Sequence, residues 1–109
     1  PREQRPPVQQ TITVFDWDDT LLCTSFIAGN PHANIQYQLR SLTALVVQLL
    51  LQALSRGRVF IVTNAVDGWV QLSAQQYMPE LLPVLSRVCI ISARSRFEWR
   101  LPGRADLWK

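Results

Sequence analysis

Three aspartates lie within four positions of one another in the segment TVFDWDDTLL, at Asp16, Asp18 and Asp19. Like charges at such short spacing repel each other, so either a bound cation or a solvated turn must offset the crowding. Carboxylates are hard oxygen ligands that suit Mg²⁺. They can also act as nucleophiles or as general acids and bases. This segment is therefore the first candidate for a catalytic site.

A second polar pair, Thr63 and Asn64, directly follows the apolar run VFIV. In an open parallel sheet, ligands bind beyond the carboxyl ends of the strands. If both polar groups follow neighbouring strands, Asp16, Asp18 and Thr20 come within reach of this pair. A hydroxyl and backbone amides can hold an anion, so a phosphate that bridges them and a metal would complete a phosphoryl-transfer site.

The elements that must position these residues alternate between strand and helix. Short, β-branched apolar runs predict strands over residues 11–15, 58–65 and 88–92. Such continuous apolar runs are typical of strands buried on both faces of a sheet. The alternation predicts parallel strands with right-handed crossovers. The expected fold class is α/β, a Rossmann-like parallel sheet with flanking helices.

The clearest helical pattern begins at Leu39, where leucines and valines recur at spacings of three and four as far as Leu54. Gly57 is placed to end this helix. One or two further helical pieces, broken by prolines, are predicted over residues 68–87. Residues 22–38 mix Gly, Asn and Pro with isolated apolar residues, which predicts a loop or a short hairpin.

The segments VFDWDDTLL and VFIVTN resemble the first two signature motifs of the haloacid dehalogenase (HAD) superfamily of phosphohydrolases. The first motif of that family is an apolar strand that ends in Asp-x-Asp-x-Thr, and the second is an apolar strand that ends in Thr or Ser. The third motif is a downstream lysine, for which Lys109 is the candidate in this chain. The fourth motif, a pair of acidic residues after another strand, has no counterpart here.

The resemblance implies a Mg²⁺-dependent phosphomonoesterase with two catalytic aspartates. Asp16 would attack phosphorus and become an aspartyl phosphate. Asp18 would protonate the leaving oxygen and then take a proton from the hydrolytic water. The Asp16 carboxylate and the Asp18 backbone carbonyl would hold the Mg²⁺ ion.

Supporting roles also follow from the resemblance. Thr63 and the amide of Asn64 would bind the phosphoryl oxygens, and Lys109 would neutralise charge near the nucleophile. Thr20 would support the turn. Asp19 stands where the family most often has glycine, and it is expected to face solvent.

The resemblance covers residues 11–109, and residues 1–10 are expected to be a disordered tail. Three strands of the HAD core leave the first strand as an open edge with a bare apolar face. The chain is therefore expected to be the front part of a longer phosphatase, or to gain the missing half by self-association through that edge. The space between Asp18 and Thr63 holds no cap domain. Capless members of the family often act on large substrates, which favours a phosphorylated macromolecule.

Composition argues against several partners. The net charge is +3, but the arginines are spread along the chain without a dense basic run, which argues against nucleic acid. No apolar stretch approaches the ~20 residues of a membrane span, and no secretory leader is visible, so the cytoplasm is the default expectation. The two cysteines form no disulfide framework. Cys89 lies in an apolar run and is predicted to be a buried free thiol.

Two other functions are compatible with parts of the pattern. A non-catalytic module could keep the fold and bind proteins; the missing acidic motif favours this, and the intact Asp16, Asp18 and Thr63 oppose it. A phosphorelay receiver domain also clusters acidic residues after its first strand. It needs an aspartate at the end of a middle strand, which neither VFIVTN nor VCIIS supplies.

Structural roles compete with functional ones at single residues. Thr63, Asn64 or Asp67 could cap the helix that follows them. Trp17 could pack beside the site or fill the core. Trp69 is interpreted as a packing residue.

Overall fold

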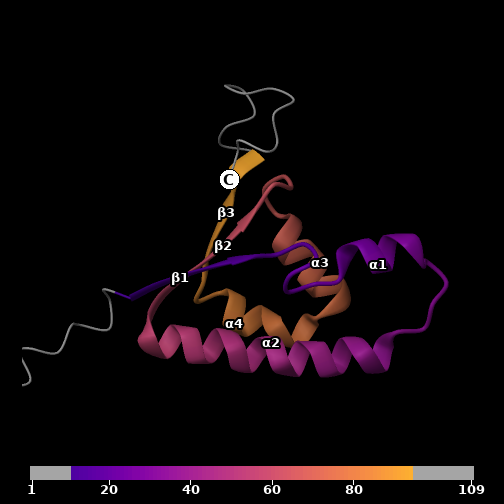
Figure 1. Cartoon of the computed structure of the whole chain (residues 1–109), viewed down its shortest axis with the longest axis horizontal. Helices are drawn as coiled ribbons and strands as arrows, with labels where there is room; N and C mark the ends of the chain where they lie inside the picture. The colour runs from indigo at the N-terminus through magenta and orange to yellow at the C-terminus, as the bar shows by residue number, and fades with distance from the viewer. Residues whose placement is uncertain (1–10, 95–109) are drawn as a thin grey trace, which may run out of the picture.

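In the computed structural model, which describes residues 11–94, three parallel strands form one sheet in the order β1-β2-β3 (Figure 1). The strands are β1 (Thr11–Asp16), β2 (Gly57–Thr63) and β3 (Cys89–Ser92). They are rich in Val, Ile, Thr and Phe, which suit the pleated, half-buried surface of a sheet. The expected α/β fold with a parallel sheet and flanking helices is confirmed.

The register brings the carboxyl ends of the strands to one edge of the sheet. Asp16 at the end of β1 is in register with Val62 of β2. Thr63 at the end of β2 is in register with Ser92 of β3. The polar residues that follow β1 and β2 therefore start from neighbouring positions.

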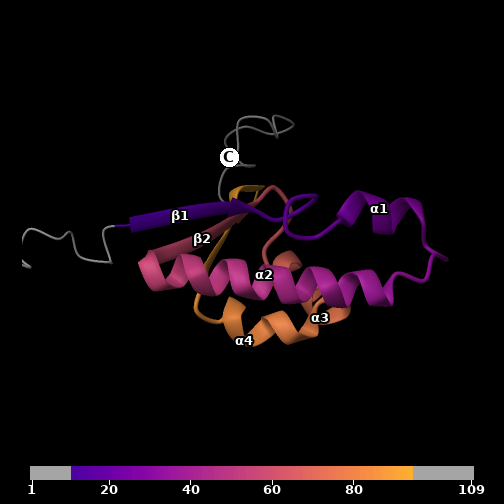
Figure 2. The same cartoon turned by 60° about the horizontal axis from the view of Figure 1, so that its bottom comes forward.

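Three helices cover one face of the sheet (Figure 2): α2 (Gln36–Arg56), α3 (Trp69–Tyr77) and α4 (Leu82–Leu85). The helix α2 ends at Gly57, as predicted. The φ angle of Gly57 is 154°, which residues with a side chain rarely adopt, so glycine lets the chain pass directly from α2 into β2. The predicted proline break is also found, because Pro79 opens a 3₁₀ turn (Pro79–Leu81) between α3 and α4.

Residues 22–38, expected to be a loop or a short hairpin, contain helix instead. The helix α1 (Thr24–Gly29) follows the aspartate-rich turn, and α2 begins at Gln36, earlier than predicted. No residue of α1 is buried, so no apolar period marks it. Its first turn is held by Asp19, whose carboxylate accepts hydrogen bonds from the amide and hydroxyl groups of Ser25. The prediction was wrong because a carboxylate from outside the helix holds this turn.

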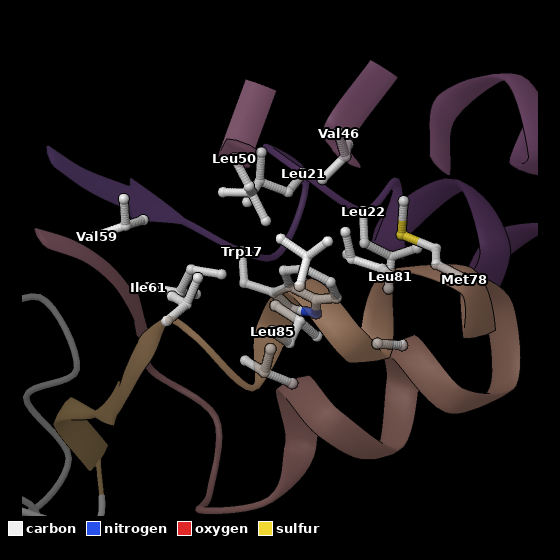
Figure 3. Packing of buried hydrophobic residues seen from close by; sticks show 14 of the residues in the cluster. Trp17, Leu21, Leu22, Val46, Leu50, Val59, Ile61, Met78, Leu81 and Leu85 are labelled. Atoms are coloured by element: carbon white, nitrogen blue, oxygen red, sulfur yellow. The ribbon is translucent and has the colours of Figure 1, made fainter. Parts of the chain in front are cut away.

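The hydrophobic core lies between the sheet and the helices, with Trp17 at its centre (Figure 3). The Trp17 side chain is fully buried, and its Nε1 donates a hydrogen bond to Ser73 Oγ of α3 at 3.0 Å. Large buried side chains from both layers surround it, among them Leu22, Leu50, Ile61 and Leu81. Of the two interpretations of Trp17, core filling is correct.

No described element covers the opposite face of the sheet. Ile12 and Val14 of β1 are 59% and 60% exposed. Val14 is in register with Phe60, and Phe60 with Cys89, so these side chains share that face. Burial on both faces is therefore wrong for the described residues, and the expected open edge and bare apolar face of β1 are confirmed. Cys89 is free, as predicted, but it is exposed on this face rather than buried.

The helix α2 has more apolar residues at helical spacing than it buries. The buried residues of α2 are Thr43, Val46, Leu50 and Ala53. Leu45 and Leu49, which belong to the same sequence pattern, are 65% and 42% exposed. Neither α2 nor any other helix within residues 11–94 has the length and hydropathy that crossing a membrane requires.

Candidate active site

The turn after β1 is closed by one backbone carbonyl. The carbonyl of Trp17 accepts hydrogen bonds from the amides of Thr20, Leu21 and Leu22 at 3.2, 2.9 and 3.1 Å. Asp19 lies inside this turn with a φ angle of 59°, in the left-handed region that favours glycine. Aspartate tolerates this conformation better than most residues with a side chain. The turn explains why glycine would fit at this position, and Asp19 is exposed, as expected.

Both carboxylate oxygens of Asp18 accept hydrogen bonds from side chains. Its Oδ1 accepts hydrogen bonds from Thr24 Oγ1 at 2.8 Å and from Trp69 Nε1 at 2.9 Å. Its Oδ2 accepts a hydrogen bond from Thr63 Oγ1 at 3.2 Å. These donors come from the start of α1, the start of α3 and the end of β2. The contact with Thr63 brings the polar residues after β1 and those after β2 together, as expected for neighbouring parallel strands.

The three aspartates accept hydrogen bonds from different side chains. Asp16 accepts a hydrogen bond from Thr20 Oγ1 at 3.3 Å, Asp18 has the donors described above, and Asp19 is bonded to Ser25. Within residues 11–94, no group of three or more His, Cys, Asp or Glu side chains could hold a metal ion. Each aspartate therefore has hydrogen-bond donors of its own, which favour the charged form of three closely spaced carboxylates.

The hydroxyl and then the amide of Ser25 hold the pKa of Asp19 below its usual value of 3.8. Ser25→Ala removes the larger of these two effects, so we expect the pKa of Asp19 to rise towards 3.8. Because the folded-state pKa is lowered, this carboxylate stabilises the fold above its unfolded-state pKa, and the contribution is lost as the pH falls through the folded-state pKa. Carboxylate-detected NMR titration of both proteins measures the shift. An unchanged Asp19 pKa would contradict the assigned bond.

Thr63 connects the ends of the strands. Its side chain is buried, and its Oγ1 accepts a hydrogen bond from the amide of Ala65 at 3.0 Å while donating to Asp18. The hydroxyl of Ser92, at the end of β3, donates to the carbonyl of Ala65. Asn64 is half-buried between these two anchored positions. The loop after β2 is therefore held to all three strand ends.

Helix capping does not explain Thr63, Asn64 or Asp67. The helix α3 begins at Trp69, its N-cap is Gly68, and no side chain forms a capping hydrogen bond there. The φ angle of Gly68 is 91°, a left-handed conformation that suits glycine. None of the three residues therefore occupies the N-cap position of α3.

A Mg²⁺ ion at this edge would need ligands from water and substrate, because no group of three or more His, Cys, Asp or Glu side chains within residues 11–94 could hold a metal ion. The Asp16 carboxylate and the backbone carbonyl of Asp18 are the two protein ligands that the family resemblance implies. Mg²⁺ commonly binds one or two carboxylates, keeps several waters and takes the remaining ligands from a substrate phosphate. Lys109, the predicted phosphate-neutralising residue, lies outside the described residues.

The edge is open rather than enclosed. A hollow of about 210 Å³ beside Asp16 is lined by Val14, Phe15, Asp16 and Val62. A larger hollow of about 520 Å³ lies between the start of α2 and the end of α3, where Arg40 and Tyr77 are among its lining residues. None of the candidate catalytic residues lines the larger hollow, so hydrogen bonding at the strand ends identifies the site better than cavity size does.

Two residues that bond Asp18 were missed by sequence reasoning. Thr24 was assigned to a loop, and Trp69 was interpreted as a packing residue. The position of Trp69, at the start of the helix after β2, was a usable signal, because loops at the carboxyl ends of neighbouring strands share one edge. No pattern in the sequence marks Thr24.

Comparisons of the chain with models of known protein families, with curated proteins and with solved structures find no match. A function must therefore be argued from the residues at this edge and their arrangement.

Proposed function

We propose that this chain carries the nucleophile and phosphate-binding motifs of a Mg²⁺-dependent, HAD-like phosphohydrolase that cleaves phosphomonoesters through an aspartyl-phosphate intermediate. The observation that carries the proposal is the 3.2 Å hydrogen bond from Thr63 Oγ1 to Asp18 Oδ2. It joins the Asp-x-Asp-x-Thr segment after β1 to the Thr-Asn pair after β2. Nucleophile, acid–base group and anion-binding groups are thus side by side at one sheet edge.

The reaction has two steps, and each combines the transfer of the phosphoryl group with the transfer of one proton. In the first step, a carboxylate oxygen of Asp16 forms a bond to phosphorus, the bond to the leaving oxygen breaks, and Asp18 gives that oxygen a proton. In the second step, water attacks the aspartyl phosphate and gives a proton to Asp18. The bond between Asp16 and phosphorus then breaks, which releases phosphate and restores both carboxyl groups.

The remaining groups bind the phosphate. Thr63 Oγ1 and the amide of Asn64 would donate hydrogen bonds to the phosphoryl oxygens, and Lys109 would add a positive charge. Thr20 Oγ1 would hold the Asp16 carboxylate through the contact described above. A Mg²⁺ ion bound by Asp16 and the Asp18 carbonyl would supply charge neutralisation at the phosphate.

The preferred substrate class is a phosphorylated macromolecule. Between β1 and β2 the described chain contains only α1 and α2, without an inserted domain to enclose the site. An open edge of this kind admits a phosphate group on a large molecule as readily as a small phosphate ester.

A second function, protein binding, is favoured by one specific observation. Ile12 and Val14 expose an apolar face on an edge strand, which is the surface that self-association or a missing half of the domain would cover. A folded chain that associates but never releases phosphate would favour this alternative.

Removing Mg²⁺ tests the proposed function directly. We expect the chain to release phosphate from 4-nitrophenyl phosphate in the presence of Mg²⁺ and to lose that activity when EDTA is in excess. Activity should return when Mg²⁺ is added back, because the ion is held by few protein ligands and exchanges freely. Phosphate release that is indifferent to EDTA would contradict the metal dependence, and circular dichroism with EDTA would control for unfolding.

A further inference from the structure

The two carboxylate oxygens of Asp18 have different donors. Oδ1 accepts from Thr24 Oγ1 and Trp69 Nε1, whereas Oδ2 accepts from Thr63 Oγ1. An indole N–H is a donor only, and a hydroxyl can both donate and accept. The two oxygens are therefore not equivalent as sites for a proton.

A proton on Oδ1 would face the N–H of Trp69, which cannot turn into an acceptor. A proton on Oδ2 meets no such conflict, because the Thr63 hydroxyl can rotate and accept. Thr24, the second donor to Oδ1, restricts the proton less. Its Oγ1 also lies 3.3 Å from the carbonyl of Leu22, so its hydroxyl hydrogen can turn to that carbonyl instead. Trp69 is thus the group that decides between the two oxygens.

We propose that Trp69 is a positioning residue that keeps Oδ1 of Asp18 as an acceptor and so assigns the transferred proton to Oδ2. This inference rests on the proposed function, in which Asp18 gives a proton to the leaving oxygen. In that step the bond between Oδ2 and hydrogen breaks, and the bond between hydrogen and the leaving oxygen forms. Trp69 itself touches no reacting atom.

The surroundings of Trp69 suit such a role. It is the first residue of α3, and its side chain packs partly against the hydrophobic core. Its backbone carbonyl accepts a hydrogen bond from Ser73 Oγ at 2.7 Å. Ser73 Oγ in turn accepts the bond from Trp17, the residue between the two catalytic aspartates. The indole is therefore anchored at its backbone and along its ring.

Phosphate binding makes the role of Trp69 more important. The Thr63 hydroxyl that bonds Oδ2 is also assigned to a phosphoryl oxygen. When it turns to the phosphate, Oδ2 is released towards the leaving group, and the contacts to Oδ1 alone hold the Asp18 side chain. Loss of the indole N–H should therefore lower kcat and leave KM nearly unchanged.

The hydrogen bond can be tested without any activity. Each of the four tryptophans contributes one indole Nε1–H resonance, and the Trp69 signal is the one that disappears in Trp69→Phe. We expect this signal to move upfield more than the other three in Asp18→Ala. Asp18→Leu, which removes both acceptor oxygens and still fills the space, provides the same comparison if Asp18→Ala does not fold. If the chemical shift of the Trp69 signal stayed the same in both variants, the inference would be overturned.

Kinetics with two leaving groups test the role of the bond. A phenolate leaving group needs a proton in the transition state far more than 4-nitrophenolate does. We expect Trp69→Phe to lower kcat for phenyl phosphate about ten-fold, roughly 1.4 kcal/mol of barrier. For 4-nitrophenyl phosphate the fall should be much smaller. Tyr37→Phe is the control, because it changes an exposed aromatic side chain of α2 outside the site, and it should leave the ratio of the two kcat values unchanged.

The outcomes separate this inference from the proposed function. Equal losses of kcat for both substrates in Trp69→Phe would overturn the positioning role and leave the phosphohydrolase standing. Loss of the phenyl phosphate activity alone would support it. No turnover by the wild-type chain with either substrate would overturn the proposed function and the proton transfer with it.

Discussion

Asp16→Asn is expected to lower kcat for an aryl phosphate by at least about 1,000-fold, as removal of a nucleophile does in other covalent mechanisms. The neutral amide has nearly the same shape, but its oxygen is a poor nucleophile and forms no stable bond to phosphorus. The Thr20 hydroxyl can still donate to it, so the fold should persist. Initial rates of phosphate release at saturating Mg²⁺, together with circular dichroism, measure both effects.

Asp19→Asn provides the matched control for Asp16→Asn. It makes the same chemical change in the same turn, at an exposed residue whose φ angle of 59° asparagine also accepts. Its kcat should stay within about two-fold of wild type, because Asp19 has no assigned part in the reaction and the asparagine oxygen can still accept the hydrogen bond from the Ser25 amide. If Asp16→Asn kept its activity while Asp19→Asn lost it, the nucleophile would be assigned to the wrong residue.

Trp17→Ala should destabilise the fold more than most other single changes, by about 3–5 kcal/mol. The indole is fully buried at the centre of the core, and Ser73 would lose the N–H that it accepts. A loss of this size is a large share of the roughly 5–15 kcal/mol that stabilise a typical domain. Urea denaturation followed by circular dichroism at 222 nm measures the change in the free energy of unfolding.

Tyr37→Ala is the control for the Trp17 experiment. Tyr37 is an aromatic residue of α2 that is 79% exposed, and alanine is a better helix former than tyrosine. The free energy of unfolding should change by less than about 0.5 kcal/mol. A Trp17→Ala protein as stable as Tyr37→Ala would show that the core does not depend on the indole.

The strand ends could be predicted because their signals are local. The apolar runs before Asp16 and Thr63, and the helical pattern between them, define a βαβ unit whatever the details of packing. In such a unit parallel strands end at the same edge, so Asp18 and Thr63 were expected to come within reach of each other if the two strands were neighbours. The structure has them in hydrogen-bond contact at 3.2 Å.

The failures of sequence reasoning have a common cause, which is that a hydrogen bond or the packing of another element decides the outcome, and apolar periodicity reveals neither. The first turn of α1 is held by the Asp19 carboxylate rather than by an apolar face of its own. Cys89 belongs to an apolar run, but its exposure depends on which face the helices cover. For the same reason Leu45 and Leu49 of α2 share the periodicity of the buried residues and yet are exposed.

The sequence by itself determined the fold class, the edge of the sheet that carries the polar residues and the residue types available there. Only the tertiary structure decided how those residues are used: the three aspartates have separate donors, and Trp69 bonds Asp18 across 51 positions of the chain. The reason is physical. Periodicity and the alternation of strands and helices follow from short stretches of the chain, whereas the partner of each carboxylate oxygen depends on how α1, β2 and α3 meet at one point.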